Sequence, residues 1–125
     1  MPTTIERVCE WCDELSGATL GYPFGPEAAV YKVGGKIFAL VAVDESPGRV
    51  TVKAPPEEGE ALRAQYAFVR EGYYMNKRHW ITIDLVAEAP LAEIRELIVD
   101  SHRLVVAGLP KATRTALRSG LGSGP

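Results

Sequence analysis

The pair Gly34-Gly35 constrains the fold of this 125-residue chain more than any other feature. Runs of β-branched, aromatic and small apolar residues flank it on both sides. Two glycines between such runs are typical of a two-residue β-hairpin turn. A second turn, Asp44 to Gly48, precedes a segment with the alternation of a half-buried strand. The sequence therefore predicts an antiparallel meander with strands at residues 28–33, 36–43 and 49–53.

Helical patterns lie on both sides of this meander. Thr3 and Glu6 have the spacing of a capping box, and apolar residues then recur at helical spacing up to Leu15. The last third carries one long apolar stripe from Leu91 to Val105. These patterns predict helices at 4–16, about 55–65, about 90–107 and 111–117, and further strands after Phe68 and at 79–85.

This order of elements predicts an α+β fold, a two-layer sandwich in which helices pack on one face of an antiparallel sheet. A chain with 46% hydrophobic and 24% charged residues has enough apolar mass for one core. We expect a single domain over residues 1–119 and a flexible tail over 120–125. The side chains expected to be largely buried are Trp11, Phe38, Val50, Ile81, Ile94 and Leu97.

Charge and hydropathy limit the classes of function. The net charge of −2 is not that of a strongly basic nucleic-acid binder, although residues 1–31 are acidic and residues 101–125 are basic. The longest apolar run, Ile37 to Val43, is far shorter than the about 20 residues that span a bilayer. With no basic-then-apolar signal segment at the N-terminus, we expect a cytoplasmic protein with no membrane partner. A monomer is the expected oligomeric state.

Cys9 and Cys12 have the CxxC spacing of redox and zinc motifs. The pair lies inside the first predicted helix, on its apolar side, and no second CxxC is present to complete a zinc site. Core packing is therefore the favoured interpretation, with redox or metal chemistry as the alternative.

Four acids of the first helix, Glu6, Glu10, Asp13 and Glu14, are three and four residues apart and share one face. Such a face is what solvation alone produces on an amphipathic helix. A weak site for a hard cation is the alternative, because these ions prefer oxygen ligands.

No local motif predicts catalysis. Adjacent helical residues point about 100° apart, so Asp100, Ser101 and His102 cannot form a relay among themselves. The chain has no nucleophile elbow, phosphate-binding glycine loop or dinucleotide fingerprint. We expect no catalytic residue, no metal site and no cofactor.

The segment from residue 70 to residue 84 concentrates cations, aromatic rings and an amide beside a strand. Lys77 and Arg78 can meet phosphates while a ring of Tyr74 or Trp80 stacks on a base. Each of these residues also has a purely structural interpretation. Trp80 can cover the sheet, and His79 can be a structural histidine whose ring nitrogens are hydrogen-bonded. Asn76 can simply supply a turn.

The same segment resembles the MmcQ/YjbR family. The matching blocks are Gly72 with Asn76, Lys77, His79 and Trp80; Tyr22-Pro23-Phe24; residues 31–39; and residues 100–105. The resemblance covers about residues 4 to 118. It implies a frataxin-like (CyaY-like) fold whose two strand-turn-strand units form a "double wing" with a DNA-binding role.

Two functional hypotheses follow. The first is a DNA-binding module, weak and largely independent of sequence, whose interface residues are Lys32, Lys36, Lys53, Arg70, Tyr74, Asn76, Lys77, Arg78, His79 and Trp80. The second is a non-catalytic domain that binds another protein, a small ligand or a cation, as frataxins do. A contiguous basic strip across both units would favour DNA, whereas cations paired with Glu57, Glu58 or Glu71 would favour the second hypothesis.

Overall fold

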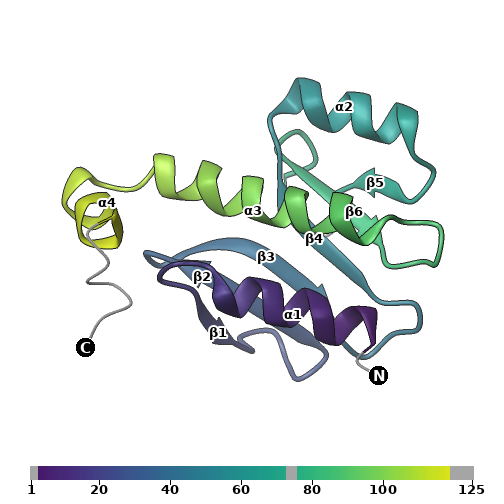
Figure 1. Ribbon diagram of the computed structural model, residues 1–125, viewed down its shortest axis with the longest axis horizontal. Coiled ribbons are helices and arrows are strands. Elements are labelled where there is room, and N and C mark those ends of the chain that lie inside the picture. The colour runs from purple at the N-terminus through teal and green to yellow at the C-terminus, as the bar shows by residue number, and fades with distance from the viewer. Residues whose placement is uncertain (1–2, 73–75, 119–125) are drawn as a thin grey trace.

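The computed structural model describes residues 3–72 and 76–118 (Figure 1). These residues form an α+β two-layer sandwich with a six-stranded antiparallel sheet of order β1-β2-β3-β4-β6-β5. The elements are α1 (Thr4–Glu14), β1 (Thr19–Gly21), β2 (Ala28–Val33), β3 (Lys36–Ala42), β4 (Arg49–Lys53), α2 (Pro56–Gln65), β5 (Val69–Glu71), β6 (Trp80–Asp84), α3 (Leu91–Ala107) and α4 (Lys111–Arg118).

The glycine pair makes the hairpin between β2 and β3, as predicted. Gly34 and Gly35 have φ angles of 57° and 81°, which are positive at both central positions of the turn. Residues with a Cβ rarely adopt this conformation, so glycine is the natural residue at both places. The predicted meander of β2, β3 and β4 is confirmed by their antiparallel pairing.

Helices α1, α2 and α3 cover one face of the sheet. This arrangement confirms the predicted sandwich. Alternation along β4 and β6 turns Val50, Val52, Ile81 and Ile83 toward these helices, and all four are fully buried. The core therefore lies between the helical layer and the sheet.

Four of the six predicted core residues, Phe38, Val50, Ile81 and Ile94, are buried. The prediction was wrong in degree for Trp11 and Leu97, which are only half-buried. Trp11 lies on the flank of α1, where the guanidinium of Arg95 covers its ring at 5.9 Å. Leu97 packs against the edge of the core and lines a shallow hollow between α2 and α3.

The elements differ from expectation in two further ways. The first helix ends at Glu14, two residues before the predicted boundary, because Leu15 leaves the helical conformation with ψ of 145°. The edge strand β1 was not predicted, since three residues carry no readable alternation.

In the part of the chain that the structure describes, no helix is long and apolar enough to cross a membrane.

Candidate nucleic-acid interface

The hydroxyl group of Ser101, in α3, lies between strands β3 and β4 at the end of the sheet. The β3–β4 pairing ends at Ala39 and Val52. Beyond this pair, the buried Ser101 Oγ donates to the Phe38 carbonyl at 2.6 Å and accepts from the Lys53 amide at 2.8 Å. The serine thus satisfies two backbone groups that would otherwise pair across the strands. The two strands diverge from this point.

A pocket of about 480 Å³ opens at this divergent end. Its cationic and aromatic residues are Lys32 of β2, Lys36 of β3, Lys53 of β4 and Trp80 of β6. Lys53 and Trp80 are direct cross-strand partners, so their side chains stand together on one face of the sheet. We call this site the lysine pocket. Ile37, with Val105 and Gly108 of α3, adds apolar and backbone lining.

The lysine pocket carries positive charge without a local counter-charge. No carboxylate lines it, and within residues 3–72 and 76–118 none of its three lysines forms an ion pair. The C-terminal end of α3 at Gly108 brings the negative pole of a helix dipole, equal to about half an elementary charge. Three ammonium groups outweigh that partial charge, so the lining of the pocket is positive overall.

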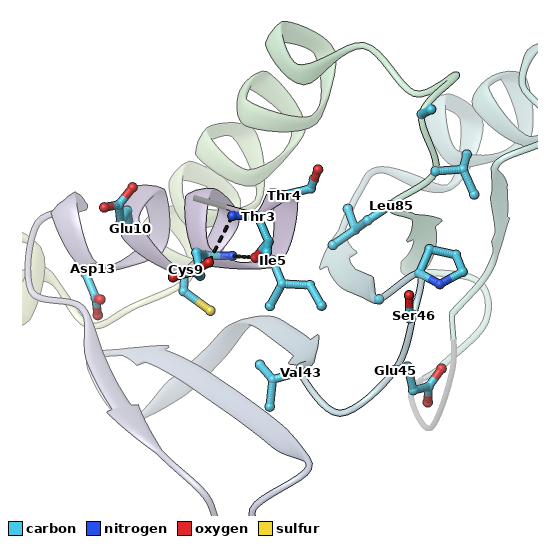
Figure 2. Close-up of a pocket in the computed structure, with 15 residues that line it drawn as sticks. Thr3, Thr4, Ile5, Cys9, Glu10, Asp13, Val43, Glu45, Ser46 and Leu85 are labelled. Carbon is cyan, nitrogen blue, oxygen red and sulfur yellow. Dashed lines mark hydrogen bonds between the residues drawn. The ribbon is translucent and has the colours of Figure 1, made fainter. Parts of the chain in front are cut away.

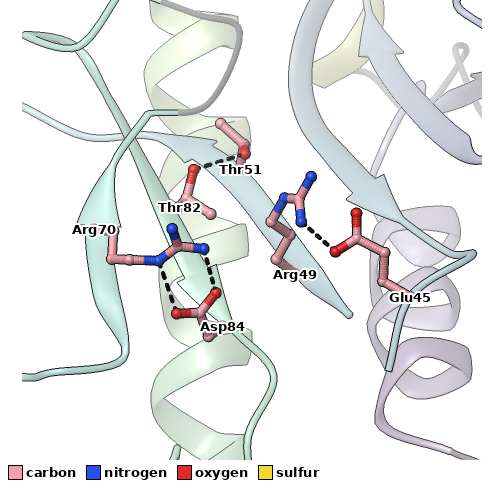
Figure 3. A network of polar contacts seen from close by, with 6 residues as sticks. All are labelled: Glu45, Arg49, Thr51, Arg70, Thr82 and Asp84. Carbon is pink, nitrogen blue, oxygen red and sulfur yellow. Dashed lines mark hydrogen bonds and ion pairs between the residues drawn. The ribbon is translucent and has the colours of Figure 1, made fainter. Parts of the chain in front are cut away.

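The other cations of the same sheet face are held by carboxylates (Figure 3). Figure 3 shows α3 behind the strands, while Thr51, Thr82 and the Arg70–Asp84 pair stand in front of them. Arg70 binds Asp84 through two hydrogen bonds of 2.8 Å and 2.6 Å. The buried Thr51 and Thr82 hydroxyls share a hydrogen bond of 3.0 Å between them. Arg49 pairs with Glu45 in the preceding loop.

The turn before β6 is organised by Asn76. Its side-chain oxygen accepts a hydrogen bond from the Arg78 amide at 2.8 Å, and its carbonyl accepts one from the His79 amide at 3.1 Å. The turn-forming interpretation of Asn76 is thereby confirmed. Lys77, Arg78 and His79 are all exposed, and the Lys77 ammonium lies 3.6 Å from the carboxylate of Glu71.

Gly72 allows β5 to lead into this turn directly against β6. A Cβ atom at Gly72 would lie 2.6 Å from the Cβ of Trp80 and 2.8 Å from its carbonyl oxygen. Any larger residue would push the two segments apart. Gly72 therefore helps to hold Trp80 at the rim of the lysine pocket, where its side chain is half-buried.

The ten predicted interface residues separate into groups. Lys32, Lys36, Lys53 and Trp80 meet in the lysine pocket, whereas Arg70 and Lys77 are paired with Asp84 and Glu71. Asn76, Arg78 and His79 form the exposed turn beside β6. Tyr74 lies outside the described residues. The cations thus gather at the end of the sheet beside the first hairpin, and not in one strip across both units.

Asp100, Ser101 and His102 have separate structural roles. Asp100 pairs with Arg103 on the surface of α3. The His102 ring packs edge-on against Phe38, with ring centroids 5.1 Å apart, and its Nε2 lies 2.8 Å from the Ser16 carbonyl oxygen. His102 therefore links α3 to the segment that follows α1.

The two cysteines are free, and Cys12 is completely buried. Burial raises the pKa of both thiols, because a thiolate loses its hydration inside the protein. Neutral thiols are poor nucleophiles and poor metal ligands. The pair therefore has the environment of packing residues, consistent with the favoured interpretation.

A larger open groove, about 1070 Å³, runs from α1 to the loop after β3 (Figure 2). Figure 2 shows Glu10 and Asp13 on one side of this groove and Glu45 on the other. Glu6 is occupied in the capping box, where hydrogen bonds from the Thr3 backbone and side chain lower its pKa. Among the described residues, no three His, Cys, Asp or Glu side chains are placed to hold a metal ion. The acids of α1 are thus a solvated face in this structure.

Comparison with known proteins defines the family. The YjbR family model matches residues 13–104, which include the three lysines and Trp80 of the lysine pocket. The chain belongs to the YjbR family. It is 39% identical over 107 residues to the uncharacterized protein YbdF of Escherichia coli O157:H7, covering 86% of this chain and 88% of that protein. It is 32% identical to the uncharacterized protein YjbR of Escherichia coli K12, covering 91% and 97%.

Solved structures share the architecture of this YjbR-family chain. The crystal structure of Deinococcus radiodurans protein DR2400, with domain DUF419, superimposes with a TM-score of 0.85 at 33% identity. That match covers 94% of this chain and 91% of the other. A protein from Pseudomonas syringae superimposes with a TM-score of 0.67 at 25% identity, covering 78% and 95%.

The sequence patterns do not reveal the structural roles of two residues of this YjbR-family site, Ser101 and Gly72. Ser101 was read as one member of the apolar stripe of α3, although it is the one hydroxyl-bearing residue among those apolar side chains. A small polar residue in such a stripe signals a buried hydrogen-bond donor. Gly72 belongs to the motif that resembles the family, and only the structure shows its close approach to Trp80.

Proposed function

We propose that this YjbR-family protein binds DNA weakly, and largely without regard to sequence, through the lysine pocket. The observation that supports the proposal is the meeting of three lysines and one indole ring from four strands in a pocket without carboxylates. Lys32, Lys36 and Lys53 would neutralise phosphates, and Trp80 would stack on a base or sugar. Arg78 and His79 in the turn beside β6 would add contacts at the rim.

Weak and sequence-independent binding follows from which groups are available. Phosphate contacts by lysine give affinity through counterion release and carry no sequence information. Reading base edges in the major groove requires a helix or ribbon that can enter it. Helices α1 and α3 are instead packed against the sheet and against each other.

The second hypothesis, a non-catalytic domain that binds another protein, a small ligand or a cation, has less support. Glu6 is engaged in the capping box, and Glu10, Asp13 and Glu45 line a broad open groove. We also propose that the fold is of the frataxin-like type, that its two strand-turn-strand units correspond to the "double wing", and that the protein is not an enzyme. Structural superposition on a frataxin would test the first of these assignments.

The proposed function is tested by direct binding with charge-matched variants. The probe is fluorescein-labelled DNA at low salt, followed by fluorescence anisotropy. The variant K32A/K53A removes two cations of the lysine pocket, and R95A/R103A removes two exposed cations from α3. We expect K32A/K53A to weaken binding about tenfold or more and R95A/R103A to leave it nearly unchanged. Absence of binding by the wild-type protein, or equal loss in both variants, would refute the proposal.

A further inference from the structure

Two aromatic rings stand exposed in the segment between β1 and β2. Tyr22 is 51% exposed and Phe24 is 61% exposed. Phe24 is the most exposed large apolar side chain of the described residues, and neither ring contributes to the core. Exposed apolar side chains that lie together in one short segment can form a contact surface.

The backbone holds these rings in a defined turn. The Gly25 amide donates to the Tyr22 carbonyl at 3.2 Å, with Pro23 and Phe24 at the two central positions. The Ala28 amide then donates to the Gly25 carbonyl at 3.3 Å, which leads the chain into β2. Proline fixes one of the central φ angles. The two rings are therefore presented on a loop whose backbone is fixed by hydrogen bonds.

Lys32 connects Tyr22, the first of these two aromatic residues, to the lysine pocket. A shallow recess of about 390 Å³ beside β1 is lined by Thr19, Tyr22, Pro23, Val30 and Lys32 among others. Lys32 also lines the lysine pocket together with Lys53 and Trp80. The surface thus runs from Trp80 over the lysines to Tyr22, with cations in the middle and a ring at each end.

We propose that this surface binds single-stranded nucleic acid in preference to duplex. The inference rests on the proposed function and names the form of nucleic acid that the site takes. The lysines would bind the backbone of one strand, while unpaired bases stack on Trp80 at one end and on Tyr22 and Phe24 at the other.

The arrangement of charges and rings favours a single strand on physical grounds. In a duplex the bases are stacked on one another, so their faces are not available to protein rings. A single strand exposes those faces, and proteins that bind it combine a cationic groove with aromatic platforms. The half-buried ring of Trp80 on one side of the lysines and the exposed ring of Tyr22 on the other match that pattern. A site for the duplex backbone alone would gain nothing from them.

The experiment compares two probes of the same length. One is a fluorescein-labelled oligothymidylate of about 12 nucleotides, and the other is a duplex of about 12 base pairs with mixed sequence. The variants are Tyr22→Ala and Phe24→Ala, with Leu91→Ala as control, because Leu91 is 40% exposed on the helical layer. We expect the single strand to bind at least about tenfold more tightly than the duplex, and each ring variant to weaken it by about 5- to 150-fold. Duplex binding should be unchanged in both variants.

The alternative outcomes are distinguishable. Equal affinity for both probes, with no effect of either ring variant while K32A/K53A still weakens both, would overturn this inference and leave the proposed function standing. No binding of either probe would overturn both. If Phe24→Ala lowers the sedimentation coefficient from that of a dimer and leaves binding unchanged, the rings form an interface between copies of the chain and the inference is wrong.

Discussion

At the scale of single residues, Ser101 shows how one side chain shapes the candidate site. Its hydroxyl takes the place of a β3–β4 backbone contact and keeps the end of the sheet open beside Lys53. A hydrogen-bonded hydroxyl in a core stabilises the fold, because its removal leaves the buried partner groups without a hydrogen bond. The same atom therefore contributes to stability and to the shape of the lysine pocket.

Replacing Ser101 with alanine should lower the free energy of unfolding by about 1–3 kcal/mol, since the Phe38 carbonyl and the Lys53 amide would lose their partner in the core. Urea denaturation measures the change. Ser16→Ala is the matched control because the Ser16 side chain is exposed, and it should stay within about 0.5 kcal/mol of wild type. A loss below about 0.5 kcal/mol for Ser101→Ala would mean that the strands close and pair without the serine.

The buried thiol of Cys12 predicts a pH dependence of stability. Its pKa is raised in the folded protein by burial, so above the ordinary thiol pKa of about 8.5 only the unfolded chain ionises. The folded state should then lose about 1.4 kcal/mol per pH unit above that value. Denaturation curves between about pH 7 and pH 9.5 should show this decline in wild type and a smaller decline in Cys12→Ala. Identical slopes would show that the thiol ionises in the folded state.

At the scale of elements, helix α3 connects the core to the candidate site. Its buried residues Ile94, Ile98, Ser101 and Val105 run from the helical layer to the lysine pocket. The periodicity of these residues predicted the helix nearly to its ends, because a stripe of this length has few alternatives. It did not reveal that α2 and α3 leave a hollow at Leu97, since that depends on how two helices pack.

Alanine replacements in α3 should separate a core position from a boundary position. Ile94 is 1% exposed, so Ile94→Ala should cost about 2–5 kcal/mol through the cavity that it leaves. Leu97→Ala should cost clearly less, because Leu97 lies in the hollow beside α2. Chemical denaturation of both variants provides the comparison. Equal losses would mean that Leu97 is part of the core in solution.

At the scale of the whole molecule, the sheet separates two kinds of surface. The helices cover the face that holds the core, and the opposite face carries the Arg70–Asp84 pair, Thr51 and Thr82. The lysine pocket opens at the end of the same sheet. The proposed binding of phosphate groups would therefore be confined to one region of a protein whose net charge is −2.

The sequence was sufficient to predict the meander, the main helices and the layer order, because hairpin glycines and periodicity are local signals. It also indicated Lys32, Lys36, Lys53 and Trp80 as interface residues. It did not indicate that these four meet while Arg70 and Lys77 pair with acids. Such partnerships depend on strand register and sheet order. The insertion of β6 between β4 and β5 brings Trp80 to Lys53, and no local pattern encodes that placement.

Contact between the lysine pocket and phosphates should appear in the salt dependence of binding to single-stranded DNA. Three to five contacts give a slope of log affinity against log salt of about −2 to −3.5. K32A/K53A should flatten this slope by about 1.4, the share of two contacts, while R95A/R103A keeps the wild-type slope. An unchanged slope in K32A/K53A, or the same flattening in both double variants, would show that the lysine pocket is not where the phosphates bind.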